Sequence, residues 1–385
     1  MYENVLTSFS QTESGAFQLD ISEVLDLVRA KDIALMGQIS IGGEATAKQH
    51  SWLKDEMRGE EVTATADAAG ALVPGEATFT VLSGHADRLR VGSIIMDKAV
   101  GLGEKLMVTN ISDPTITVVV WPAGTNAAQT HAQSAKFLIV GAPIKEMAAP
   151  TDESATTRAL KSNYIQLFER GISLSDETKN LKMRAVPNEE SYQIEKKTWS
   201  VKRELGVTVL YGVQHSPGTV DDYGTMGGIL EFLDVADANR IQASANLSEK
   251  DVNDLAQKIL DKGGQPDIIV VGTDQSRKFA TFDRARIRTV PSSTITGHFV
   301  DTYQTDTGLR LPIIVEPKLV TEYLLMLTKK DIKITPFHNE AWSVYTWPRT
   351  KYATQTTVKG AYTMEVRNAY ENHGIVTGLT VPEDL

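Results

Sequence analysis

The one stretch whose residues could bind a nucleotide is a strand, turn and helix at residues 268–276, Ile-Ile-Val-Val-Gly-Thr-Asp-Gln-Ser. A helix that begins after a buried strand presents free backbone N–H groups, and these can bind phosphate. The turn contains neither G-x-G-x-x-G nor G-x-x-x-x-G-K-[ST], so it lacks the glycines that admit a pyrophosphate. We interpret this stretch as a structural β-α connection.

The residue types used in acid/base, nucleophilic and metal catalysis occur without the spacing that such sites need. The chain has no cysteine and seven histidines, no two of which stand at the i, i+4 spacing of a helical metal site. Acid pairs such as Glu60-Glu61 and Asp221-Asp222 are adjacent, so their carboxylates do not point at one reacting group. No G-x-S-x-G motif is present. We expect no enzyme, no catalytic residue, no metal site and no cofactor.

The composition is that of an ordinary globular chain with an acidic balance. Its 385 residues suffice for two or three compact units, because single cores stop growing near ~250–300 residues. The net charge of −10 opposes a broad nucleic-acid-binding face. The densest basic run, Arg284 to Arg288, holds only three arginines and is interpreted as a solvated loop or a contact to an acidic neighbour. The lack of cysteine fits an intracellular folding compartment, and no apolar run approaches the ~18 residues of a membrane span.

The first 45 residues contain one helix signal between loose ends. Asp20 can cap this helix, and Glu23 stands three residues later. Its apolar stripe is Ile21, Val24, Leu25 and Val28. So short a helix is marginal alone and must find an apolar partner elsewhere, which can be another subunit.

The region between residues 75 and 140 predicts closely spaced strands. Asp113-Pro114 and Gly124-Thr125 supply turns between them. The predicted strands are 77–82, 93–97, 105–111, 115–121 and 136–140. Short strands in so compact a stretch indicate a small barrel or sandwich.

The clearest helix runs from Asn188 to Gly212. Asn188 caps it, and its apolar stripe is Ile194, Val201, Leu205 and Val209. Beyond it the pattern is mixed α/β, with a capping box at Ser248 and Asp251 and a buried strand at 267–271. Later predicted strands are 311–316, 323–327, 332–335, 342–347 and 354–362.

Several segments in succession resemble the major capsid proteins of tailed bacteriophages with the Hong Kong 97-like fold, in the branch with a β domain inserted in the extended loop. Trp52-Leu-Lys-Asp-Glu-Met57 resembles the W-L-x-D-x-[LM] element at the start of the loop. Gly124-Thr-Asn-Ala-Ala-Gln-Thr-His131, followed by Leu138-Ile-Val-Gly141, resembles the barrel end. Residues 163–168 and 172–175 resemble the strand that returns from the loop. The similarity continues through residues 266–282, 306–308 and 342–379.

The resemblance implies an α+β capsid fold with four parts. They are an N-terminal arm at 1–50; an extended loop at 51–180 with an inserted small β-barrel at about 73–147; a peripheral domain at 181–221 and 337–385 that includes the long spine helix; and an axial domain at 222–336. The extended loop would lie over a neighbouring subunit.

The resemblance also implies a function and its partners. The chain would be a major capsid protein that self-assembles as hexamers and pentamers into an icosahedral head shell around phage double-stranded DNA. Its partners would be copies of itself and portal, scaffolding and decoration proteins, with DNA enclosed without sequence-specific binding and no membrane. It would be assembled in the host bacterial cytoplasm and end in the virion.

Charged and aromatic residues on these elements are candidates for contacts between subunits. They are Trp52, Asp55 and Glu56 at the loop base, Glu169 and Arg170 on the returning strand, and Lys196, Lys197 and Arg203 on the spine helix. The alternative for each one is an ordinary solvated surface residue.

Two other classes of protein stay open. One is an encapsulin-type compartment or another virion shell or decoration protein, and a cargo-docking pocket beside the N-terminal helix would favour the former. The other is an α/β enzyme that holds a phosphate ligand at 272–276, which thermal stabilisation by a nucleotide would support.

Overall fold

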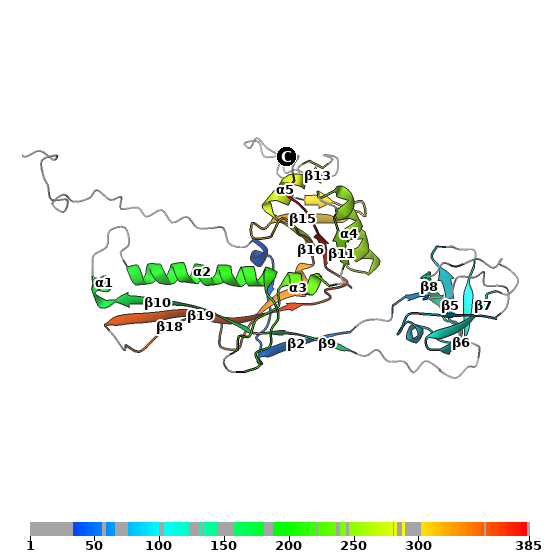
Figure 1. The fold of residues 1–385 in the computed structure, drawn as a ribbon, viewed down its shortest axis with the longest axis horizontal. Coiled ribbons are helices and arrows are strands. Elements are labelled where there is room, and N and C mark those ends of the chain that lie inside the picture. The colour runs from blue at the N-terminus through cyan, green and yellow to red at the C-terminus, as the bar shows by residue number, and fades with distance from the viewer. Residues whose placement is uncertain are drawn as a thin grey trace, which may run out of the picture. The chain divides into compact units, whose positions relative to one another are not determined.

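The computed structural model divides the chain into two compact units, which we call the body (Met1–Trp52 with Leu160–Leu385) and the β unit (Leu53–Ala159). Figure 1 shows the helices and strands of both units. The residues described are 34–55, 59–65, 76–99, 104–122, 131, 134–144, 146, 158–180, 188–219, 222–235, 239–243, 246–279, 281–282, 287–288, 302–349 and 352–382. The predicted helix near residues 20–28 lies outside them.

The β unit is built on one six-stranded antiparallel sheet, in the order β3-β8-β5-β6-β7-β4. The strands are β3 (Glu61–Thr63), β4 (Glu76–Thr80), β5 (Ile94–Asp97), β6 (Leu106–Ser112), β7 (Thr115–Val120) and β8 (Lys136–Gly141). An isolated bridge between Ala64 and Val81 joins the two end strands, so the sheet closes on itself. A short 3-10 helix, η2 (Ala86–Arg88), lies between β4 and β5.

Alternation along these strands creates the core of the β unit. Inward side chains such as Phe79, Val108 and Phe137 are at most 2% exposed. The five predicted strands are present as β4 to β8, with ends that differ from the prediction by at most two residues. The sequence reading missed β3, because its three residues are too few to show an alternating pattern.

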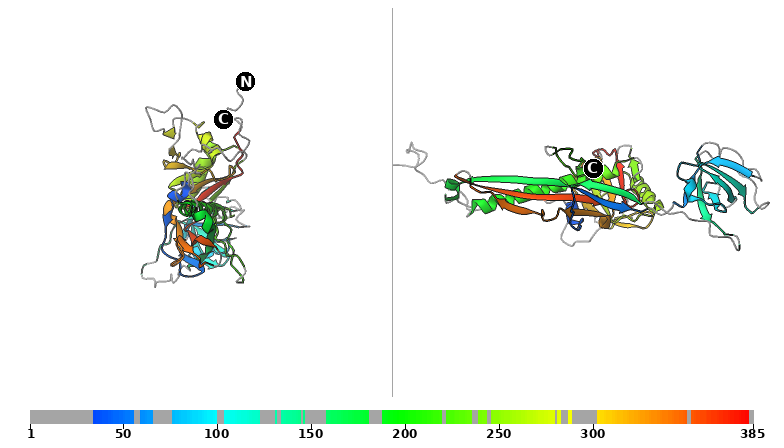
Figure 2. Two further views of the ribbon diagram at one scale, coloured as in Figure 1. Left: turned by 90° about the vertical axis from the view of Figure 1, so that its left-hand side faces the viewer. Right: turned by 90° about the horizontal axis from the view of Figure 1, so that it is seen from below.

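The body contains a five-stranded sheet with a long helix on one face (Figures 1 and 2). Its strands are β1 (Ser40–Ile41), β17 (Ile332–Pro336), β19 (Ala353–Val366), β10 (Gln166–Ser175) and β18 (Ser343–Thr346). β10 and β19 pair antiparallel along the whole of β10, and Figure 2 shows them side by side as the longest strands. A 3-10 turn, η1 (Ala34–Gly37), precedes β1.

The long helix, α2 (Glu189–Tyr211), confirms the prediction for residues 188–212. The side chain of Asn188 accepts a hydrogen bond from the backbone N–H of Ser191 at 3.2 Å, which satisfies a free donor of the first turn. Val201, Leu205 and Val209 are buried against the β10–β19 side of the body, in one cluster with Phe168. The apolar stripe therefore attaches α2 to the sheet.

A seven-stranded sheet forms the rest of the body, in the order β11-β20-β16-β12-β15-β14-β13. The strands are β11 (Asn239–Gln242), β12 (Ile268–Val271), β13 (Ile287–Arg288), β14 (Thr302–Gln304), β15 (Arg310–Val315), β16 (Leu324–Leu327) and β20 (Gly374–Thr377). The other helices and turns described in the body are α1 (Asp176–Asn180), α3 (Ile229–Leu233), α4 (Glu249–Asp261), α5 (Thr273–Phe279) and η4 (Lys329–Asp331). Of these, α4 packs on β11 and β20 of the seven-stranded sheet, whereas α1 packs on β10 and α3 on α2. The predicted capping box of Ser248 and Asp251 at the start of α4 is confirmed.

Two strands near the C-terminus differ from the sequence expectation. β19 extends to Val366, four residues past the predicted end, because residues 362–366 pair with β17. β20 lies between β11 and β16, so residues 374–377 complete the sheet formed by residues 239–327.

None of the helices in the parts of the chain that the structure describes has the length and apolar content needed to cross a membrane.

We predict that Leu205→Ala lowers the free energy of unfolding by about 2–5 kcal/mol, because it opens a cavity under α2 at a side chain that is 1% exposed. Val207→Ala, at an exposed position of the same helix, should change it by less than ~0.5 kcal/mol. Urea unfolding of the unassembled subunit measures both. Equal effects of the two substitutions would contradict this packing of α2.

Candidate assembly interface

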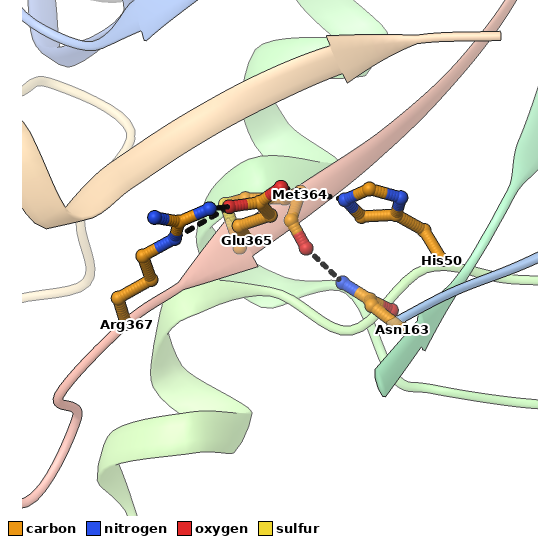
Figure 3. A network of polar contacts seen from close by, with 5 residues as sticks. All are labelled: His50, Asn163, Met364, Glu365 and Arg367. Carbon is orange, nitrogen blue, oxygen red and sulfur yellow. Dashed lines mark hydrogen bonds and ion pairs between the residues drawn. The ribbon is translucent and has the colours of Figure 1, made fainter. Parts of the chain in front are cut away.

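The chain leaves the body along β2 (Gln49–Lys54) and returns along β9 (Ala159–Tyr164), and these two strands pair with each other. A polar cluster holds both strands to the end of β19, and we call it the root network. It consists of His50 from β2, Asn163 from β9, and Glu365 and Arg367 from the end of β19 and the residues after it (Figure 3).

Asn163 is the fully buried member of the root network. Its side-chain amide donates to the carbonyl oxygens of Met364 at 2.8 Å and Gly227 at 3.1 Å. Its side-chain oxygen accepts from the backbone N–H groups of Gly227 at 2.8 Å and Tyr164 at 2.9 Å. One buried side chain thus joins three backbone segments, and all of its polar atoms are satisfied by these bonds.

Glu365 is the charged centre of the root network. His50 Nε2 lies 2.6 Å from one of its carboxylate oxygens, and Arg367 donates to the other from Nε at 2.8 Å. Burial acts to raise the pKa of Glu365, but the hydrogen bonds from His50 and Arg367 and the charge of Arg367 outweigh it. The pKa of Glu365 therefore lies below its usual value of 4.5.

Sequence reasoning missed the root network because its contacts are far apart along the chain. His50 and Glu365 are separated by 315 residues, and Asn163 and Met364 by 201. No periodicity or spacing in one sequence connects such positions.

The predicted contact residues at the loop base lie in different surroundings. Trp52 is 7% exposed, and its ring stands 6.1 Å from the ring of Phe232 in its own chain. The Asp55 carboxylate lies 3.4 Å from the Nε of Arg158, the residue directly before β9. Glu56 is outside the described residues.

The two candidates on β10 point to opposite faces of the five-stranded sheet. Arg170 lies on the α2 side, where its guanidinium is 2.7 Å from the carboxylate of Glu204. Glu169 is exposed on the other side, directly across the strand pair from Lys359. The structure therefore joins Arg170 to α2 and separates it from Glu169.

The candidates on α2 form no shared cluster with those at the loop base. Lys196 is exposed, with its Nζ 5.9 Å from the ring centroid of Tyr192. Lys197 is half-buried and Arg203 is exposed. Their role in contacts between subunits stays a prediction.

The turn considered for phosphate binding uses its residues within the fold. A Cβ on Gly272 would come within 2.8 Å of the carbonyl oxygen of Leu319, so close packing accounts for the glycine. The amide of Gln275 donates to Thr321 O and Thr380 O, and Asp274 accepts from the hydroxyl of Thr321. The side chains of Asp274 and Gln275 thus hold the first turn of α5 to residues 321 and 380.

The β unit contains a buried polar triad that the sequence did not indicate. His131 Nδ1 lies 2.6 Å from a carboxylate oxygen of Asp97, its Nε2 lies 3.2 Å from Glu104, and all three side chains are at most 2% exposed. Within the described residues no group of His, Asp or Glu could hold a metal ion. We interpret the triad as an internal attachment of His131 to β5.

We predict that Glu365→Gln lowers the free energy of unfolding at pH 7 by about 1.5–3 kcal/mol, the usual range for a hydrogen bond to a charged group. The folded-state pKa of Glu365 is lowered, so its stabilisation is fully present above pH 4.5 and is lost as the pH falls through the folded-state value. The difference between wild type and variant, measured by urea unfolding at several pH values, should therefore shrink in acid. A difference that stays constant down to acid pH would contradict an ionised Glu365.

Solved structures share this fold at low sequence identity. The capsid of an empty GTA particle matches with a TM-score of 0.56 and 10% identity, over 98% of this chain and 100% of that chain. The capsid of a native GTA particle gives 0.53 and 11%, over 98% and 100%. Microbacterium phage Oxtober96 gives 0.50 and 9%, over 94% and 96%. These likenesses show the fold, which is the Hong Kong 97-like α+β capsid fold.

Sequence comparison adds the family. No curated protein matches the chain. Residues 2–380, nearly the whole chain, match the family described as SU10 major capsid protein. The chain therefore belongs to the SU10 major capsid protein family, and it is a structural component of a phage head shell, found in the virion capsid and not an enzyme.

Proposed function

We propose that this major capsid protein assembles as hexamers and pentamers into an icosahedral head shell that encloses phage double-stranded DNA. The observation that carries the proposal is the separation of the hydrophobic cores. The β unit has its own core, formed by residues between Val62 and Ile139, and the body has two others. A unit with a hydrophobic core of its own suits contacts with other copies of the chain.

The four parts of the capsid fold can be assigned to the observed elements. The helix α2 with β18 and β19 suits the peripheral domain at 181–221 and 337–385, to whose sheet β1, β10 and β17 add from outside those bounds. The seven-stranded sheet suits the axial domain at 222–336, with β20 added through its pairing with β11 and β16. The arm at 1–50 and the extended loop at 51–180, with an inserted β domain at about 73–147, would reach neighbouring subunits.

The charge of the subunit is consistent with a DNA container. A net charge of −10 opposes tight, sequence-independent binding of phosphates, so packed DNA would remain free to leave the head. The proposal includes portal, scaffolding and decoration proteins as further partners, with assembly in the host bacterial cytoplasm.

We predict that the purified chain forms closed shells, or rings of five and six subunits, when it is expressed alone and imaged by negative-stain electron microscopy. Large summed interfaces drive such assembly even though each contact is modest. A uniform monomer or dimer, unchanged after concentration and after addition of a candidate scaffolding protein, would contradict the proposal.

We predict that Arg170→Glu abolishes particle assembly and leaves a soluble, folded subunit. The Arg170 and Glu204 side chains are 48% and 39% exposed, and an exposed pair of this kind contributes only ~0–1 kcal/mol to folding. Sedimentation velocity measures the particle yield, and circular dichroism checks the fold. Lys202→Glu, at an exposed position of α2, is the matched control.

A double substitution separates the two ways in which Arg170 can act. Arg170→Glu with Glu204→Arg restores the pair within one chain but keeps the reversed charge on β10. Continued loss of assembly would support a contact to another subunit. Recovery of assembly would show that Arg170 acts through Glu204, and normal particles from the single variant would remove Arg170 from the interface.

A further inference from the structure

The body carries a groove of about 830 Å³ on the face of the five-stranded sheet that α2 does not cover. Side chains alternate along β10, so Phe168 and Ile172 are buried toward α2 whereas Leu167 and Glu169 project to the opposite face. The partners of Leu167 and Glu169 in the register, and the alternate residues of β18, lie on that same face. Alternate side chains of these strands therefore line a face of the sheet that α2 does not cover, and the groove lies on this face.

Large apolar side chains line this groove and remain exposed. The exposed fractions are 75% for Leu167, 83% for Tyr223, 46% for Tyr345 and 49% for Trp347. Single exposed apolar residues are ordinary, but a cluster of aromatic residues around one groove is typical of a binding surface.

Two of the aromatic side chains are held in place before anything binds. The rings of Tyr345 and Trp347 meet edge to face with centroids 5.1 Å apart. The indole N–H of Trp347 donates to the hydroxyl of Thr357 at 2.8 Å, which fixes the orientation of the ring. A partner that enters this groove therefore loses little conformational entropy to order it.

We propose that the groove binds residues 18–31 of another copy of the chain. This inference rests on the proposed assembly of the chain into shells. It identifies a particular contact, an apolar segment in an aromatic groove, that the family and the fold do not specify.

The sequence of residues 18–31 supplies the matching surface. Its apolar residues Ile21, Val24, Leu25 and Val28 recur at helical spacing, and charged residues occupy positions between them. An amphipathic helix that lays three or four such residues into a hydrophobic groove is a common mode of peptide recognition. Isolated helices of this length are marginal in water, so the segment gains from a partner.

The place where the described chain begins favours another copy over the same copy. Leu35 is fully buried in one cluster with Val201 and Leu205, and its backbone N–H donates to the carboxylate of Glu316 at 3.1 Å. The chain thus enters the body on the α2 side of the sheet, and the groove is on the other side. A neighbouring copy in a shell can present its segment without a path around the sheet edge.

Cysteine pairs test the contact directly, because the chain has no cysteine of its own. Leu25→Cys is combined with Leu167→Cys at the groove, and the matched control combines Leu25→Cys with Val320→Cys, which is 51% exposed outside the groove. Assembled particles are oxidised with diamide and run on a non-reducing gel. We expect a ladder of linked chains at a yield ~10-fold above the control, because binding raises the effective concentration of the two thiols.

Each other result overturns the proposal. A linked product that migrates as a monomer would place the segment in the groove of its own chain. A yield no higher than the control would mean that the groove does not bind this segment. Particle formation is scored separately by electron microscopy. Particles that form without a cross-link contradict only this inference, whereas the absence of particles contradicts the proposed function.

Substitution of the groove gives an independent measurement. Trp347→Ala should reduce the cross-linking yield at least ~10-fold, since truncation of a central aromatic residue commonly removes most of the binding free energy of a small contact. Tyr352→Ala, which removes a side chain that is 93% exposed outside the groove, should leave the yield unchanged. An unchanged yield in Trp347→Ala would overturn the role of the groove.

Discussion

The satisfaction of buried polar groups where β2 and β9 meet the body is the constraint on which the rest of the structure depends. Two strands that leave a compact body expose backbone groups that their own pairing cannot satisfy. The side chain of Asn163 bonds to one backbone group of β9, at Tyr164, and to three backbone groups of the body, at Gly227 and Met364. Glu365 binds both His50 and the guanidinium of Arg367. The position of the β2–β9 pair on the body is therefore determined by directional bonds and not by apolar packing alone.

Local patterns were sufficient for the elements with strong signals. The Asn188 cap and the apolar stripe of α2, the capping box of α4 and the strands β4 to β8 all follow from residues that are close in sequence. The resemblance to phage capsid proteins depended on short motifs in order, and the family match over residues 2–380 agrees with it.

Long-range pairing could not be predicted in the same way. β19 continues to Val366 only because β17 pairs with it, and the root network joins residues 201 and 315 positions apart. The environment of Trp52, which packs on Phe232 in its own chain, and the Arg170–Glu204 pair also depend on tertiary structure. Residue type alone therefore could not distinguish a side chain that packs within its own chain from one that contacts another subunit.

The strand order of the two body sheets also sets the order in which the chain can fold. Every strand of the β unit pairs with strands from the same stretch of about eighty residues, between β3 and β8, so that unit can close while the rest is still being synthesised. The body needs β1 to pair with β17 and β11 to pair with β20, and β20 consists of residues 374–377. The two sheets of the body therefore cannot be completed before residues 374–377 have been synthesised, whereas the β unit needs only residues 61–141.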